Sequence, residues 1–219
     1  MDTFEIHLTV PASTSKVVME ALATELSSKH QVHVSYTPLL LQMTNGAMNE
    51  MMFTTQISAN GVVRAIYKAY ELAESISEHG LEVLRRKVEV PFTFQGPDLK
   101  DFNPDGYCEV HIEVYLPNDS ERQRVFGKLC NEHSMFVSYN TRKIQDSGQV
   151  AICTIRSATA SETESPKHDM NILLSACLAS LDKEGFSVLE YQKEICYFDT
   201  NVEHDIEWLN TSIREVHHM

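Results

Sequence analysis

The sequence predicts an α+β protein of two tandem ferredoxin-like βαββαβ repeats that form one body with pseudo-two-fold symmetry. The first observation is that FEIHLTV at 4–10 returns as CEVHIEV at 108–114. The second is that two further echoes, VSY at 34–36 and Gly80, recur 103 and 105 residues later, since 137 − 34 = 103 and 185 − 80 = 105. A nearly constant spacing indicates a duplicated structural unit. The third is that each half contains the same order of strand and helix patterns.

The elements of the first repeat follow from their side-chain patterns. Residues 4–10 alternate apolar and polar side chains, which is the period of a strand with one buried face. Ser13 or Thr14 can cap the helix that follows, and Gly80 is placed to end a second helix. The predicted elements are strands 4–10, 32–41, 51–57 and 81–91, a helix that carries the apolar residues from Val17 to Leu26, and a helix over 61–79.

The second repeat has the same order, and the composition between the halves indicates a linker. Its predicted strands are 107–116, 135–142, 149–157 and 186–197, and its predicted helices are 120–132 and 168–184. Proline and glycine gather between the halves, as in connecting segments. We therefore divide the chain into a first repeat at 1–91, a linker at 92–106, a second repeat at 107–199 and a C-terminal helical extension at 200–219.

Charge and cysteine usage restrict the partners and the compartment. The net charge is −13, from 31 acidic and 18 basic residues, and an acidic surface repels nucleic acid and acidic phospholipid. The five cysteines all lie in the second half without a C-x-x-C pair, which is not the pattern of a disulfide framework. No apolar run reaches membrane-spanning length. We expect a cytoplasmic monomer or homodimer with no nucleic-acid or membrane partner.

A Glu-x-His pair on the first strand of each repeat is the candidate site. Side chains two residues apart on a strand project to the same side, about 7 Å apart. We expect these pairs on an open sheet face opposite the helices, beside polar and charged residues of the fourth strands, among them Glu190, Gln192 and Glu194. If the two open faces meet, the charged groups share one cleft. The candidate ligand-binding residues are Glu5, His7, Thr9, Arg85, Lys87, Glu89, Glu109, His111 and Glu113.

Four interpretations of this surface stay open. It is a solvated or mutually paired sheet face, as alternating strands usually have. It is a cleft for a small anionic ligand that uses the two histidines with Arg85 and Lys87. It is a catalytic or divalent-metal site, for which His7, His111, Glu5 and Glu109 are suitable ligands. It is a surface for a protein partner, without a small-molecule site.

One local motif is similar to the two-histidine phosphoesterases, which are also duplicated. His7-Leu8-Thr9 matches their His-x-Thr element, in which the histidines act as general base and acid and the hydroxyls hold phosphate. The second copy has Glu113 in place of the hydroxyl, and a carboxylate repels phosphate. The similarity therefore suggests a hydrolase only as an alternative to ligand binding.

Almost the whole chain resembles an uncharacterised, mainly bacterial family of proteins with two ferredoxin-like halves. The residues that carry the resemblance are Phe4–Val10, Tyr107-Cys108-Glu109-Val110-His111, and Phe198-Asp199-Thr200-Asn201 followed by Asp205 and Trp208. The family has a Gln-Pro-Met element before its third strand, where this chain has Glu50-Met51-Met52. The resemblance implies the duplicated architecture and the Glu-x-His pairs, and it implies no reaction. From the residues themselves, Asp199 and Asn201 are expected to cap the turn after the last strand.

Overall fold

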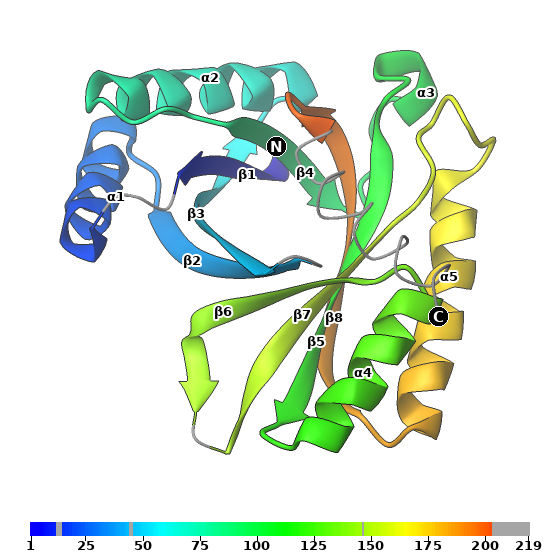
Figure 1. Cartoon of the computed structure of the whole chain (residues 1–219). Helices are drawn as coiled ribbons and strands as arrows, with labels where there is room; N and C mark the ends of the chain where they lie inside the picture. The colour runs from blue at the N-terminus through cyan, green and yellow to red at the C-terminus, as the bar shows by residue number, and fades with distance from the viewer. Residues whose placement is uncertain (12–14, 44–45, 146, 203–219) are drawn as a thin grey trace. The chain divides into compact units, whose positions relative to one another are not determined.

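The computed structural model describes residues 1–11, 15–43, 46–145 and 147–202 (Figure 1). These residues form a mixed α/β fold with eight strands and five helices. The element order is βαββαβ, then a short helix α3 (Leu99–Phe102), then βαββαβ again, so the predicted order of both halves is confirmed. The predicted C-terminal extension lies outside the described residues from 203 onward, and Asp205 and Trp208 with it.

Two compact units divide the chain. Unit 1 contains Met1–Pro38, Asn49–Gly106 and Glu194–Val202, and unit 2 contains Leu39–Met48 and Tyr107–Lys193. The division crosses three strands, because unit 2 takes the end of β2 and the start of β3, and unit 1 takes the end of β8. The boundaries that we drew from the repeat follow the sequence echo and not the packing, so they stay a prediction.

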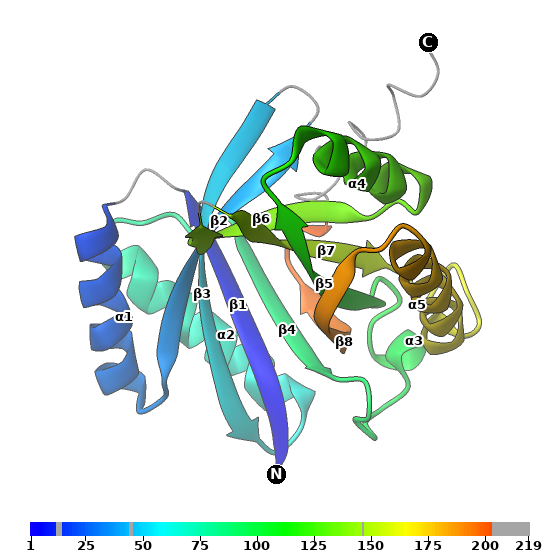
Figure 2. The same cartoon turned by 90° about the horizontal axis from the view of Figure 1, so that it is seen from below.

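Unit 1 is built around β1, which pairs antiparallel with β3 on one side and with β4 on the other. On its other edge β4 pairs with the end of β8. The helix α2 packs on β1 and β4 with α1 beside it, and both helices lie on one face of this sheet (Figures 1 and 2). The elements are β1 (Asp2–Pro11), α1 (Lys16–His30), β2 (Val34–Met43), β3 (Gly46–Ala59), α2 (Val62–Glu78), β4 (Arg85–Pro91) and β8 (Ser187–Asp199).

Unit 2 is built around β5, which pairs antiparallel with β7. The strand β6 pairs with the other edge of β7, and Leu39–Leu41 of β2 pair with β6. The helices α4 and α5 pack on β5. The elements are β5 (Tyr107–Pro117), α4 (Ser120–Glu132), β6 (Phe136–Gln145), β7 (Gly148–Arg156) and α5 (Pro166–Lys183).

The largest differences from the predicted strand boundaries are in the third and fourth strands, for identifiable reasons. The third strand is longer than 51–57, because β3 pairs along the whole of β1, from Asp2 opposite Ala59 to Pro11 opposite Glu50. The fourth strand begins at Arg85 and not at 81, since the chain first leaves α2 through Gly80, whose φ of +76° needs glycine. None of the described helices is long and apolar enough to cross a membrane.

The alternation of β1 is confirmed, but its polar face is not an open one. Phe4, Ile6 and Leu8 are buried, as the pattern predicts. On the opposite face His7 and Thr9 are buried as well. Of the interpretation as a solvated or mutually paired face, the solvated form is wrong for these two side chains, whereas His7 and Lys87 do pair with Glu89. Buried polar groups need partners, and those partners define the site.

Candidate functional site

Each unit holds the imidazole of its Glu-x-His pair against a threonine of the neighbouring strand. The β1–β3 register places Thr54 opposite His7, and the β5–β7 register places Thr154 opposite His111. The distance from His Nδ1 to Thr Oγ1 is 3.0 Å in unit 1 and 2.9 Å in unit 2. The two units thus share an imidazole–hydroxyl pair that the sequence analysis did not identify.

In unit 1 the other ring nitrogen of His7 meets a buried carboxylate from β4. His7 Nε2 lies 2.9 Å from Glu89 Oε2, and Lys87 Nζ lies 2.9 Å from Glu89 Oε1. These contacts arise because β4 pairs with β1 so that Lys87 is opposite His7 and Glu89 is opposite Glu5. Glu89 is completely buried. The Lys87 ammonium and the His7 ring at ion-pair distance offset part of the cost of burying this carboxylate.

The carboxylate of the motif itself lies farther from the ring in unit 1. Glu5 Oε1 is 3.6 Å from His7 Nε2, and Glu5 Oε2 accepts a hydrogen bond of 3.1 Å from the side-chain amide of Gln56. Gln56 lies opposite Glu5 in the β1–β3 register. Glu5 therefore has a neutral partner and stays at the rim, while Glu89 takes the position next to the imidazole.

An arginine–carboxylate pair lies farther along β4 in the same unit. Arg85 Nε donates to Asp199 Oδ1 at 2.9 Å, and an Arg85 terminal nitrogen donates to Asp199 Oδ2 at 2.5 Å. Asp199 Oδ1 also accepts from the backbone N–H of Asn201 at 3.0 Å, so it does cap the turn after β8 as expected. The bidentate geometry fixes Asp199 strongly and engages the guanidinium.

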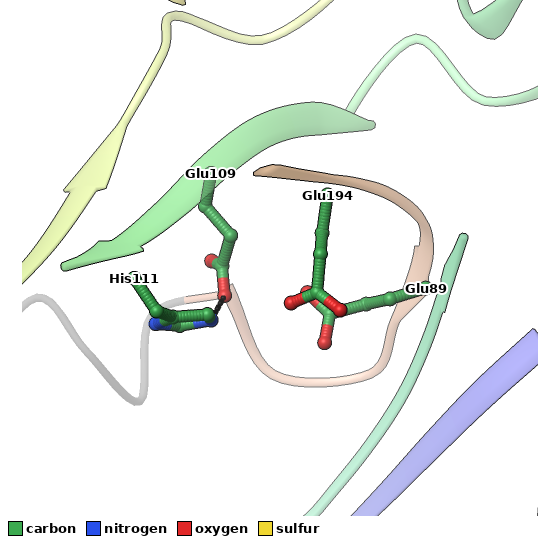
Figure 3. Close-up of side chains that lie close together, drawn as sticks. All are labelled: Glu89, Glu109, His111 and Glu194. Atoms are coloured by element: carbon green, nitrogen blue, oxygen red, sulfur yellow. Dashed lines mark ion pairs between the residues drawn. The ribbon is translucent and has the colours of Figure 1, made fainter. Parts of the chain in front are cut away.

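In unit 2 the motif's own glutamate is the buried carboxylate. Glu109 Oε1 lies 2.9 Å from His111 Nε2, and the two side chains approach each other from one strand (Figure 3). Glu109 Oε2 lies 3.3 Å from a guanidinium nitrogen of Arg156, which is opposite Glu109 in the β5–β7 register. The guanidinium carbon of Arg156 also lies 4.1 Å from the centre of the Tyr107 ring. This cation–π contact holds Arg156 in place.

In both units Nε2 of the histidine lies 2.9 Å from a carboxylate oxygen, which is an ion-pair contact. A threonine hydroxyl either donates or accepts a hydrogen bond. It therefore matches Nδ1 whether that nitrogen is bare or protonated.

Metal ligands of the right type also lie in both units. In unit 1 a carboxylate oxygen of Glu89 and one of Glu194 lie within 4.8 Å of each other, and Figure 3 shows the two side chains converging. In unit 2 Glu109 and His111 present an oxygen and a nitrogen. Carboxylate and imidazole suit zinc, manganese and related ions. Two ligands from one unit leave the rest of a coordination shell to water or other donors.

The remaining predicted residues are placed less centrally. Thr9 is buried on the same face of β1, opposite Arg85 of β4. Glu113 is half-buried and lies opposite Ile152. Of the expected neighbours on β8, Glu194 is buried, whereas Glu190 and Gln192 are exposed. The distance between His7 and His111 belongs to the arrangement of the two units, so the predicted shared cleft stays a prediction.

Four partners were missed by sequence reasoning, and a signal for them exists. Thr54 is followed two residues later by Gln56, and Thr154 by Arg156. These positions are 100 residues apart, since 154 − 54 = 100, and they lie on the strand that follows the repeated VSY element. Pairing that strand with the Glu-x-His strand in antiparallel fashion would have brought threonine to histidine and position 56 or 156 to glutamate.

Comparisons with known proteins name no family for the chain. No family model and no curated protein matches it. Among solved structures, the acetolactate synthase small subunit from Thermotoga maritima is similar with a TM-score of 0.31 at 13% identity, over 91% of this chain and 97% of that one. Aspartate kinase from Synechocystis is similar with a TM-score of 0.24 at 10% identity, over 96% of this chain and 53% of the kinase. Likenesses this low support no conclusion about function.

Proposed function

We propose that this protein consists of two ferredoxin-like repeats and binds a small molecule at the Glu-x-His group of each. One observation carries the proposal. Each unit holds an imidazole by a threonine at Nδ1 and by a buried carboxylate at Nε2, at distances between 2.9 and 3.0 Å. Buried ionisable groups are costly for stability and concentrate where ligands or protons are handled. The same arrangement in both units favours a functional origin over chance packing.

The chemistry of the cluster favours a ligand with hydrogen-bond donors or positive charge. From the sequence, Arg85 and Lys87 suggested that the ligand is an anion. Both now hold carboxylates, since Arg85 pairs with Asp199 and Lys87 with Glu89. Arg156 likewise pairs with Glu109. An anion would compete with these carboxylates, whereas an ammonium group or a divalent cation would join them.

A metal-dependent enzyme is the second candidate. The observation that favours it is the approach of Glu89 and Glu194, whose carboxylate oxygens lie within 4.8 Å. Two acidic oxygens at this distance can share a divalent cation, and a neighbouring imidazole can act as a general base. In this proposal Glu89 and Glu194 would hold the cation, which would supply an activated water, and His7, 2.9 Å from Glu89, would be the nearby general base.

The setting we propose is a reducing cytoplasm, with a monomer or homodimer as the working form. All five cysteines are free and buried, which supports a reducing compartment. Size-exclusion chromatography with light scattering would measure the oligomeric state.

Calorimetry tests the ligand class. The probes are Zn²⁺, Mn²⁺ and ethanolamine, each titrated into wild type and into the double variant His7→Ala/His111→Ala. The matched control is His79→Ala/His133→Ala, which removes two histidines outside the motif. We expect at least one probe to bind wild type and the control, and to lose its binding in the motif variant. Equal binding in both double variants would exclude the motif as the site. Capture of a protein partner that survives the motif variant would instead support an interaction module.

A further inference from the structure

Unit 1 has a hollow at the edge of its helical layer. It is lined by the cations Arg64 and Lys68, whereas the Glu-x-His group is built around buried carboxylates. Its volume is about 660 Å³, which is within the range of small-molecule sites. The turn between α1 and β2 forms one wall, the end of β3 forms a second, and the first turns of α2 form the third. All of the lining residues belong to unit 1.

Two cations of α2 face this hollow. Arg64 and Lys68 both line it, and they are four residues apart on one helix face. Lys68 Nζ lies 3.1 Å from Glu71 Oε2 and 3.1 Å from His30 Nδ1. Arg64 is exposed and forms no ion pair with any residue in the described part of the chain. Its guanidinium therefore presents its donors to whatever occupies the hollow.

Arg64 lies in an unfavourable place on its helix, whereas the charge of Lys68 is offset by Glu71. Like charges four residues apart destabilise a helix, and a cation in the first turn opposes the helix dipole. α2 has no acidic residue in its first turn and no side-chain cap at Gly61. The pKa of His30 is lowered first by its burial and then by the nearby Lys68 and Lys29, while Glu71 and Glu78 oppose the shift. In a chain of net charge −13 such a basic spot is unusual.

The corresponding place in unit 2 lacks both cations. The spacing of 105 residues between Gly80 and Gly185 aligns Arg64 with Asp169 and Lys68 with Leu173, since 64 + 105 = 169 and 68 + 105 = 173. Asp169 lies in the first turn of α5, where an acid is favourable. In unit 2 the partial positive charge at the start of the helix therefore has an acidic neighbour, Asp169. The first turn of α5 also contains Lys167, but no cation occupies the positions that align with Arg64 and Lys68.

We propose that this hollow binds a small organic anion, a carboxylate or phosphate monoester with an aromatic or aliphatic body. Arg64 would hold the anionic group, with Lys68, which is paired with the lining residue Glu71, as a secondary contact. The ring of Tyr67, which is 64% exposed, and the side chains of Val32 and Ile57 would contact the apolar body. Gln56 borders the hollow and also donates a hydrogen bond to Glu5. An occupant that moved Gln56 would therefore change the surroundings of Glu5.

In the test, phenyl phosphate, benzoate and inorganic phosphate are each titrated into the full chain, and NMR measures their binding. The variants are Arg64→Gln and Arg64→Gln/Lys68→Gln, and the matched control is Arg124→Gln, which removes an exposed arginine from α4. We expect phenyl phosphate or benzoate to shift the amide signals of Asn60, Arg64 and Tyr67. We expect roughly 10-fold weaker binding in Arg64→Gln, as for loss of a charge-assisted contact, and no change in Arg124→Gln.

Further arms separate the sources of binding. Inorganic phosphate should bind more weakly than phenyl phosphate, because it lacks the apolar body. Thr54→Val alters the Glu-x-His group and should leave phenyl phosphate binding intact. A loss of ligand binding at the Glu-x-His group can therefore be told apart from a loss of anion binding at the hollow. Equal affinity of wild type and Arg64→Gln, or shifts that avoid α2, would overturn the proposal.

Discussion

The Glu-x-His groups of the two units share their sequence pattern but bury different members of it. The side chain of His7 is 11% exposed and that of Glu5 is 19% exposed. In unit 2 the order is reversed, since His111 is 30% exposed and Glu109 is 1% exposed. Within the motif of unit 1 the imidazole is the more buried side chain, and it lies beside a carboxylate of another strand. Within the motif of unit 2 the glutamate is the more buried side chain.

The cross-strand neighbour explains the difference. Glu5 faces Gln56, a neutral amide, whereas Glu109 faces Arg156, a cation. A buried carboxylate needs a positive partner, so Glu109 is stable inside the protein and Glu5 remains near the surface. Unit 1 supplies its buried carboxylate from Glu89, together with the cation Lys87. What the two units keep in common is the imidazole–hydroxyl pair, and what differs is the source of charge around it.

The largest expected effect is on the buried glutamate. Glu109→Gln removes the charge that Arg156 and His111 both face, and breaking such a buried pair costs about 3 kcal/mol in the free energy of unfolding. Glu5→Gln, at the rim, should cost less than about 1 kcal/mol. Urea unfolding followed by circular dichroism measures both. Similar losses for the two variants would contradict the contrast between the units.

Removal of the threonine hydroxyls tests the shared part of the two groups. Thr54→Val and Thr154→Val each leave His Nδ1 without its hydroxyl partner, at a cost of about 1 kcal/mol. The loss should be larger for Thr54, because His7 is the more deeply buried imidazole. The matched controls Thr54→Ser and Thr154→Ser retain the hydroxyl and should retain the stability and the histidine ¹⁵N shifts. If serine and valine behave alike, the hydroxyl contact has no energetic role.

Transfer of the unit 2 neighbour into unit 1 would sharpen the comparison. Gln56→Arg places a guanidinium opposite Glu5, as Arg156 is opposite Glu109. We expect a gain of about 0.5 kcal/mol, the size of a partly exposed ion pair. NMR should show Glu5 moving from the side of His7 toward position 56. A variant with unchanged stability and an unmoved Glu5 would show that the neighbour does not decide the glutamate's position.

The smallest expected effect concerns a second pair that both units share. His30 Nε2 lies 2.9 Å from Ser75 Oγ in unit 1, and His133 Nε2 lies 2.8 Å from Ser180 Oγ in unit 2. Lys68 is the additional member in unit 1, and after burial it is the main cause of the lowered pKa of His30. Lys68→Leu should raise that pKa toward its ordinary value of 6.5 without reaching it, because burial remains.

The sign of the pH dependence follows from the lowered pKa. The unfolded chain binds the His30 proton at a higher pH than the folded chain, so the contribution of His30 to stability decreases as the pH falls below about 6.5 and through the folded pKa. An NMR titration of the His30 ring measures the pKa in wild type, in Lys68→Leu and in the control Lys128→Leu. A His30 pKa that stays the same in Lys68→Leu would exclude Lys68 as a cause.

Sequence reasoning predicted the element order and much of the first strand's chemistry. The alternation of residues 4–10, the stop at Gly80 and the echo at 108–114 all follow local rules of strand period and helix termination. The same parity placed Arg85, Lys87 and Glu89 on one side of β4, and the register sets them opposite Thr9, His7 and Glu5. The length of β3 escaped prediction, because its pairing with β1 and not its own pattern determines it.

By itself, the sequence determined which side chains share a strand face, because that depends only on a period of two residues along the chain. The tertiary structure decided which partner each received. Thr54, Arg156 and Asp199 reach their partners across strands that are 47, 47 and 114 residues away in the chain. Burial also depends on tertiary packing, since a polar face is exposed or enclosed according to what lies over it. Local pattern thus selected the histidines, and long-range strand register determined what surrounds them.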